Sequence, residues 1–451
     1  MNRLILIGNG FDLAHDLKTS YKDFIEYLWR RIHDQLYKQV KLNYSNHQSK
    51  NIRFIDQDKL LIISITKISE WEGGTAYSLN ASPLVGVILL EESIFQDDIP
   101  AFILDIKELE CIYENSFFEK ISTSYLDKNW SDIEADYYAE LKESIDGSDK
   151  TSNKKNVQKL NEDFSQIKEL LAGYLSQLKK HLPIPEIKAY IYSPINMQHV
   201  KLRSLGVICN HVNAIIPTLG RSSKEAITNY LSNKGINQYV AKDKLTPENI
   251  LKKSVFMEGD SILITPESIL MLNLNYTNTV SQYQSLQVLN NFSGNPTPVE
   301  AVQIHGTLAS PEEMIFGYGD EEDEKYKKLE MSEIRGLLDN VKSINYLKSP
   351  NYRNLERFIE SGPYQIFIMG MSCGLSDRTL LRKLFQHENC ISIVPFYYQY
   401  MCKEGGKEVR KDNFNELSQN ISRCFSNKDL LRSLVVDKTN CKPLVSISEK
   451  Q

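Results

Sequence analysis

The sequence predicts an α/β fold, a Rossmann-like parallel sheet flanked by helices, with a large and mainly helical insertion. Short segments that are apolar at every position occur near the N-terminus and again beyond residue 260. Such segments are typical of strands in a parallel sheet that is covered on both faces. Several of them end in glycine-rich or polar turns, and between the two regions the apolar residues follow helical spacing.

The first predicted strand is Leu4-Ile5-Leu6-Ile7, which ends at Gly8-Asn9-Gly10. Apolar and aromatic residues then recur at roughly helical spacing over 11–29 and predict one helix. Strand, glycine turn and helix form the first half of a βαβ unit.

Residues 31–255 are predicted to be the helical insertion. Within it, 121–145 and 157–182 have helical spacing, while 59–68 and 190–193 are strand candidates. The segment 146–156 is rich in Ser, Asp and Lys and lacks apolar side chains, which indicates a surface loop or linker.

The sheet is expected to continue beyond the insertion. Predicted strands lie at 262–264, 269–274, 299–304, 365–369 and, as an edge strand, 391–398, and predicted helices at 377–385 and 414–425. We therefore predict a discontinuous Rossmann-like nucleotide-binding domain at 1–30 and 256–400, followed by a C-terminal helix and tail at 401–451. Ligands of such sheets bind at the carboxyl ends of the strands.

Composition excludes several classes of function. The chain has 451 residues, 41% of them hydrophobic and 25% charged, and a net charge of -5. A dedicated nucleic-acid surface would normally bring a basic excess. Seven scattered cysteines without a CxxC pair fit a reducing cytoplasm. The apolar runs at 4–7 and 84–90 are too short for a signal peptide or a membrane span, so we expect a soluble cytoplasmic protein.

No metal site is expected. The acidic run 320–324 could bind a divalent cation, but it also suits a solvated loop. Neither Cys209 with His211 nor Cys390 with His387 has a second pair at the spacing of a zinc site.

The turn after the first strand is a candidate nucleotide contact. Gly8 and Gly10 let the backbone approach a phosphate at a helix N-terminus, and Asn9 and Asp12 lie in the same turn. The third glycine of the dinucleotide fingerprint is replaced by Leu13. A simple tight turn explains the pattern equally well.

Two further strand ends carry candidate catalytic residues. Asn275 follows the strand at 269–274, where its amide could hold a water or a sugar hydroxyl. His305 follows the strand at 299–304 and precedes Gly306, a position suited to a general base. Asn275 could instead serve an Asx turn, and a lone histidine is often structural.

The last strand ends in Gly370-Met371-Ser372, and Asp377 opens the next helix. Glycine after a strand and an acid at a helix start suit ribose recognition, so we take Gly370, Ser372 and Asp377 as candidate nucleotide contacts. Alternatively, Ser376 and Asp377 only cap the helix.

Together these motifs resemble the AbiH family of bacteriophage abortive-infection proteins. The resemblance spans nearly the whole chain, and the motifs occur in the same order. They are the segment 7–15, Asn129-Trp130 with Glu134, Asn275 to Thr279, Ile304-His305-Gly306, and Gly370-Met371-Ser372 through Ser376-Asp377.

More distantly, the set is similar to sirtuin-like NAD-binding domains of bacterial defence systems. That resemblance implies that Asn275 and His305 take part in NAD cleavage, and that Gly8, Gly10 and Asp377 contact the nucleotide. The chain departs from the pattern twice. Thr277 replaces the aspartate expected after Asn-Tyr, and Asp12 replaces the serine of the first turn.

The resemblance implies an anti-phage effector that hydrolyses NAD to nicotinamide and ADP-ribose. The alternative is a sensor or regulatory protein that binds NAD or ADP-ribose without cleaving it. NAD would be a substrate rather than a resident cofactor. The implied partners are a phage-encoded trigger and further copies of the chain. A nuclease or tRNA-targeting toxin is disfavoured because the sequence has neither a basic groove nor a cluster of metal-binding carboxylates.

Overall fold

The computed structural model describes most of the chain. The described residues are 1–45, 52–65, 69–70, 88–90, 102–104, 109–123, 130–144, 150–179, 182–201, 204, 206, 265–284 and 297–447. They form two compact units. Unit 1 comprises Met1–Leu17, Leu178–Lys327 and Asn340–Gln451, and unit 2 comprises Lys18–Gln177 and Lys328–Asp339.

Unit 1 is built on a five-stranded sheet in which every neighbouring pair is parallel. In spatial order its strands are β11 (Cys390–Phe396), β10 (Tyr364–Met369), β1 (Asn2–Ile7), β8 (Ile269–Asn273) and β9 (Val299–Gln303). The chain starts at the centre, adds β8 and β9 on one side, and returns to add β10 and β11 on the other. This is the Rossmann strand order, which reverses between β1 and β10. The predicted α/β fold is confirmed.

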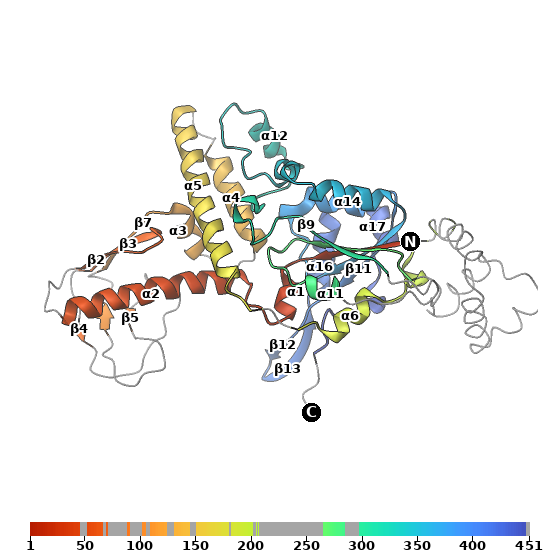
Figure 1. Cartoon of the computed structure of the whole chain (residues 1–451), viewed down its shortest axis with the longest axis horizontal. Helices are drawn as coiled ribbons and strands as arrows, with labels where there is room; N and C mark the ends of the chain where they lie inside the picture. Colours follow the sequence, from red (N-terminus) through yellow and green to blue (C-terminus); the bar gives the residue numbers. More distant parts are fainter. Residues whose placement is uncertain are drawn as a thin grey trace, which may run out of the picture. The chain divides into compact units, whose positions relative to one another are not determined.

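The side chains of β1 point alternately to the two faces of the sheet, and each face carries its own hydrophobic core. Leu4 and Leu6 belong to one core, Ile5 and Ile7 to the other. The first core is completed by α14 (Asn351–Glu360), α15 (Arg378–Phe385), α16 (Phe414–Arg423) and α17 (Lys428–Leu434). The second is completed by α1 (Asn9–Ala14), α6 (Pro185–Ile191) and α11 (Ser281–Gln284). Figure 1 shows α14 and α6 on opposite sides of the strands.

The predicted helix over 11–29 is wrong as a single element. It is divided into α1 and α2 (Tyr21–Ser45), with Asp16 at a positive φ of 57° between them. The start of α2 is fixed locally, because the Asp23 backbone N–H donates to the Ser20 hydroxyl and the Ser20 N–H donates to the Asp23 carboxylate. This reciprocal pair is a capping box.

Two other local predictions are also wrong. Residues 190–191 end α6 and are not a strand, because Pro185 occupies the first turn of a helix whose Ile187 and Ile191 face the core one turn apart. The expected loop at 146–156 is helical from Lys150 onward, where α5 (Lys150–Leu175) begins, because Asn153, Val157 and Leu160 lie at helical spacing on one buried face. The strand predicted at 262–264 lies outside the described residues.

Unit 2 combines helices with two small sheets. Its helices are α2, α3 (Ser116–Thr123), α4 (Trp130–Glu143) and α5. Phe117, Tyr137 and Phe164 pack together at its centre. One sheet pairs β2 (Ile52–Ile55), β3 (Leu61–Ile65) and β7 (Leu109–Tyr113), and the other β4 (Ser69–Glu70), β6 (Phe102–Leu104) and β5 (Ile88–Leu90).

The C-terminal region adds to unit 1 a hairpin of β12 (Gln399–Glu404) and β13 (Lys407–Asp412). Helix α16 agrees with the helix predicted at 414–425, whereas the hairpin and α17 were not foreseen. The remaining short elements are η3 (Met197–His199), η6 (Pro311–Glu313), α12 (Glu324–Glu330), α13 (Lys342–Asn345), η7 (Tyr346–Lys348), η8 (Leu375–Asp377) and η9 (Lys438–Asn440). Among the described residues, no helix has the length and apolarity needed to cross a bilayer.

Candidate functional site

The turns after β1 and β10 touch backbone to backbone where the strand order reverses. The Gly10 N–H donates to the Gly370 carbonyl at 2.7 Å. A Cβ on Gly10 would lie 2.9 Å from the Gly370 Cα, and a Cβ on Gly370 would lie 2.0 Å from the Phe11 nitrogen. Gly370 also has a φ of +70°, which favours glycine. The glycines therefore allow close packing of the two turns, and the Gly10 N–H is already engaged within the protein.

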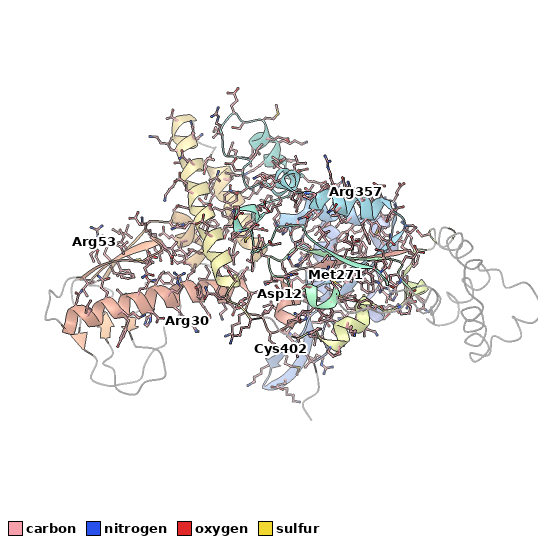
Figure 2. The ribbon with its side chains drawn as sticks, in the orientation of Figure 1. Asp12, Arg30, Arg53, Met271, Arg357 and Cys402 are labelled. Carbon is pink, nitrogen blue, oxygen red and sulfur yellow. The ribbon has the colours of Figure 1, made fainter. Side chains whose placement is uncertain are left out.

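Asp12 is buried in α1 (labelled in Figure 2), with 1% of its surface exposed. One carboxylate oxygen accepts a hydrogen bond from the hydroxyl of Thr277, in the turn after β8. The other oxygen, Oδ1, is buried without a hydrogen-bond partner among the described residues. Burial raises the pKa of the Asp12 carboxyl, and the nearby polar groups of Thr277, Thr279 and Asn275 oppose that rise.

Asn275 links the turns after β8 and β1. Its side-chain amide donates to the Gly8 carbonyl at 3.0 Å, and its backbone N–H donates to the side chain of Asn273 at 3.1 Å. Asn273 in turn donates to the Thr277 carbonyl and to Gln303 at the end of β9. These bonds hold Asn275 at the carboxyl end of the sheet.

His305 is buried after β9, with both ring nitrogens near protein atoms. Nδ1 lies 3.0 Å from the Leu274 carbonyl, next to Asn275, and Nε2 lies 3.2 Å from the Tyr346 hydroxyl. A carbonyl only accepts hydrogen bonds, so Nδ1 carries the proton when this bond forms. In the neutral ring Nε2 then has a free electron pair, which can accept a proton or a hydrogen bond.

Asp377 connects His305 with a buried lysine. Its Oδ1 lies 3.3 Å from His305 Nε2 and 2.8 Å from Lys342 Nζ. The Lys342 side chain is only 2% exposed. Burial alone would raise the pKa of Asp377, but the positive charge of Lys342, helped by His305 when its ring is protonated, outweighs burial and holds that pKa well below its usual range. Asp377 is therefore an ionised carboxylate at neutral pH.

The structure brings most of the predicted residues together. Hydrogen bonds or close contacts join Gly8, Gly10, Asp12, Asn275, His305, Gly370 and Asp377 through the four turns. We call these residues, with Thr277, Lys342 and Tyr346, the strand-end cluster. Asn9 is half-buried at the start of α1. Ser372 is exposed, and its carbonyl accepts a hydrogen bond from Asn420.

Sequence reasoning missed Lys342 and Tyr346. Lys342 lies in α13 and Tyr346 in η7, outside the turns that directly follow the predicted strands, and no local pattern indicates that a lysine will be buried. Glu134 is buried in unit 2, outside the strand-end cluster.

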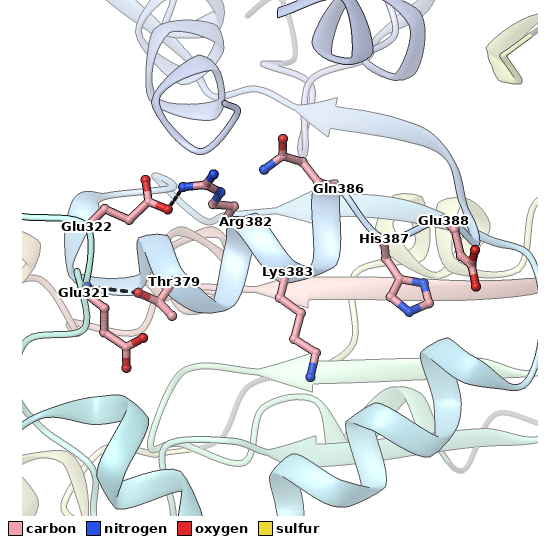
Figure 3. Close-up of a pocket in the computed structure, with 8 residues that line it drawn as sticks. All are labelled: Glu321, Glu322, Thr379, Arg382, Lys383, Gln386, His387 and Glu388. Carbon is pink, nitrogen blue, oxygen red and sulfur yellow. Dashed lines mark hydrogen bonds and ion pairs between the residues drawn. The ribbon is translucent and has the colours of Figure 1, made fainter. Parts of the chain in front are cut away.

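The acidic run 320–324 is partly paired with arginines of α15. Asp320 accepts a hydrogen bond from Arg378, and Glu322 pairs with both Arg378 and Arg382. Figure 3 shows the Glu322–Arg382 pair at the edge of an open pocket of about 710 Å³. Among the described residues, no group of three or more His, Cys, Asp or Glu side chains could hold a metal ion.

The family of the chain follows from comparison with protein-family models. The model described as "Bacteriophage abortive infection AbiH" matches residues 4–398, which include the whole strand-end cluster. Neither the search of curated proteins nor that of solved structures finds a match. Because the match covers most of the chain and agrees with the motifs read from the sequence, the chain belongs to the AbiH family of bacteriophage abortive-infection proteins.

Proposed function

We propose that this chain acts in abortive infection by hydrolysing NAD to nicotinamide and ADP-ribose. The observation that carries the proposal is that Asn275, His305 and Asp377 come from three separate strand ends and converge at the carboxyl edge of a Rossmann-ordered sheet. That edge is where such sheets bind nucleotides.

The proposed reaction needs few catalytic groups. The bond between ribose C1′ and the nicotinamide nitrogen breaks, its electron pair neutralises the pyridinium ring, and water adds to C1′. Positive charge develops on the ribose in the transition state, as in other glycosidic cleavages. The water must lose one proton, so a positioned base is the main requirement.

His305 is our candidate for that base. Its Nδ1 proton is directed to the Leu274 carbonyl, which leaves Nε2 as the proton acceptor. When Nε2 takes the proton, the imidazolium gains the nearby carboxylate of Asp377 as its counter-ion. Lys342 keeps Asp377 ionised and ready for that role.

The polar groups beside His305 suit ribose and nicotinamide binding. Asn275 presents a side-chain amide at the edge of the sheet, and Asp12 has a buried carboxylate oxygen that accepts no hydrogen bond from the residues that the structure describes. An unpartnered buried oxygen is costly, and a donor group on a ligand would satisfy it. We assign Gly8, Asn9, Gly370 and Ser372 to the approach of the phosphates.

One observation favours a second function, that of a nucleotide sensor that binds without cleaving. The Asn275 amide and both ring nitrogens of His305 already have protein partners, as structural residues would. In that case the strand-end cluster binds NAD or ADP-ribose, and a phage-encoded trigger binds elsewhere on the chain.

Nicotinamide release from NAD by the purified full-length chain tests the proposal, with NAD binding followed in parallel. His305→Ala and Asn275→Ala should lose release, for His305 by about 10²–10⁴-fold, the usual contribution of a general base. His387→Ala and Asn278→Ala are matched controls, since both residues lie outside the strand-end cluster, and they should keep full activity.

Binding without release would favour the sensor, or an enzyme that awaits its trigger. Absence of both would overturn the assignment of NAD. Release that survives both site variants would overturn the assigned residues.

A further inference from the structure

The hydroxyl of Tyr346 meets the one nitrogen of His305 that can accept a proton. It lies 3.2 Å from Nε2, and the planes of the two rings are parallel to within 3°. Both side chains are buried. Because Nδ1 directs its proton to the Leu274 carbonyl, Nε2 of the neutral ring can only accept a hydrogen bond. Tyr346 is therefore the donor in this contact.

The other polar neighbours of His305 cannot take that place. Asp377 Oδ1 lies 3.3 Å from Nε2, but an ionised carboxylate has no proton to donate. The ring of Tyr276 also lies beside His305, with centroids 6.5 Å apart, yet its hydroxyl donates to the Ile315 carbonyl at 3.0 Å. Of these neighbours, Tyr346 alone can donate to Nε2.

One helical turn delivers both Tyr346 and Lys342. Tyr346 continues the conformation of α13 with a φ of -59° and a ψ of -21°, and residues four apart in a helix lie on the same face. Lys342 contacts Asp377 at 2.8 Å, and Tyr346 contacts His305. The ring of Tyr346 stacks on that of Tyr352, with centroids 5.5 Å apart, so its hydroxyl is held in place.

This arrangement leaves the proposed base with an occupied acceptor. A general base takes a proton through its electron pair, and the Tyr346 hydroxyl is bonded to the electron pair of His305 Nε2. A water molecule therefore cannot bond to Nε2 while Tyr346 does. A hydroxyl both donates and accepts hydrogen bonds, so the Tyr346 oxygen can receive a proton while its own proton moves to Nε2.

We propose that Tyr346 is a catalytic residue that relays a proton from the attacking water to His305. The proposal rests on the NAD hydrolysis proposed above. As the water oxygen bonds to ribose C1′, one water proton passes to the Tyr346 oxygen and the hydroxyl proton passes to Nε2. The electron pair of the broken C1′–N bond stays with nicotinamide. Tyr346 ends neutral, and His305 ends as an imidazolium beside Asp377.

Nicotinamide release by a Tyr346→Phe variant of the full chain tests the relay. The kcat should fall about 10–100-fold, less than the loss expected for His305→Ala, because His305 can still take the proton directly. Binding of NAD and the circular dichroism spectrum should match those of the wild type. Tyr352→Phe is the matched control, since it removes the hydroxyl of the ring that stacks on Tyr346, and it should keep the wild-type kcat.

Two further measurements separate a relay from a structural role. Tyr346→Phe should cause no further loss in a His305→Ala background, because residues that act as a unit are not additive. In mixtures of light and heavy water, the wild-type rate should depend on the deuterium fraction along a curve, since two protons move together. The rate of Tyr346→Phe should depend on it linearly, since only one proton moves.

Each contrary result has its own meaning. A Tyr346→Phe variant with full kcat, losses that add in the double variant, or a linear dependence in the wild type would overturn the relay and leave the proposed hydrolysis standing. A wild type that binds NAD without releasing nicotinamide would overturn the hydrolysis and the relay together.

Discussion

Thr277 donates a hydrogen bond from its hydroxyl to the buried carboxylate of Asp12, and so joins the turn after β8 to the helix after β1. These are the two positions at which the chain departs from the sirtuin-like pattern. Thr277 has a hydroxyl where the pattern has an acid, and Asp12 has an acid where the pattern has a hydroxyl. The two substituted residues are therefore in contact. Thr277 supplies the hydroxyl donor and Asp12 the carboxylate acceptor, so the two turns still share one donor and one acceptor.

This exchange predicts that the two positions are coupled. Asp12→Ser and Thr277→Asp should each lower the free energy of unfolding by about 1–3 kcal/mol, because each leaves a buried polar group badly matched. The double variant restores a hydroxyl–carboxyl pair and should recover most of the loss. Urea denaturation of the four proteins measures the coupling energy. Additive losses would show that the two residues do not depend on each other.

The Lys342–Asp377 ion pair predicts that removing one partner lowers the stability of the fold strongly. Asp377→Asn leaves the ammonium group of Lys342 buried without its counter-ion, which typically costs about 3–5 kcal/mol. Lys342→Met should be destabilising too, but less so, because Asp377 keeps His305 as a neighbour. Denaturant unfolding measures both. Equal stability of Asp377→Asn and wild type would contradict the ion pair.

The same pair predicts how stability depends on pH. The pKa of Asp377 is lower in the folded chain than in the unfolded chain, so the unfolded carboxyl takes up its proton first as the pH falls. The stability that Asp377 contributes is complete well above the unfolded pKa of about 3.9 and decreases below it. The difference in unfolding free energy between wild type and Asp377→Asn should therefore be constant from pH 8 to about pH 5 and shrink below pH 4. A difference that shrinks above pH 5 would contradict this assignment.

Glycine packing between β1 and β10 predicts a sharp contrast between two Gly→Ala substitutions. Gly10→Ala drives a Cβ into the Gly370 backbone and should destabilise unit 1 by about 1–3 kcal/mol. Gly173→Ala, within α5, meets no atom within 4 Å and should stabilise by about 0.5–1 kcal/mol through helix propensity. Thermal unfolding compares the two, and a tolerated Gly10→Ala would refute close packing of the turns.

The contacts of Arg3 predict that the stability of the fold depends on its guanidinium group and not only on its charge. Its side chain is fully buried and donates to the carbonyls of Ile191 and Ser193 at the end of α6, and to Gln365. Lysine cannot reproduce this set of directed donors. Arg3→Lys and Arg3→Met should each cost about 2 kcal/mol or more. In both variants, amide hydrogen exchange should become faster in α6 before it does so in the rest of unit 1. If Arg3→Lys kept the full stability of the wild type, the positive charge alone would be sufficient and the directed donors of the guanidinium group would not be needed.

Much of unit 1 could be predicted from the sequence because its signals are local. Runs such as Leu4 to Ile7 can be buried only between two layers, and each turn follows its strand directly. The capping box at Ser20 and Asp23 was also present in the sequence, and with it the division of 11–29 could have been predicted. Pro185 gives the start of α6 in the same way.

By itself, the sequence determined the α/β class, the strand-end positions of Asn275, His305 and Asp377, and the resemblance to the AbiH family, since each is read from short motifs whose residues are neighbours in the chain. Only the tertiary structure decided which of these residues meet. The Asp12–Thr277 contact, the burial of Lys342 beside Asp377 and the packing of Gly10 on Gly370 each join segments at least 35 residues apart. Those contacts depend on strand order, and strand order is set by how the cores on the two faces of the sheet pack.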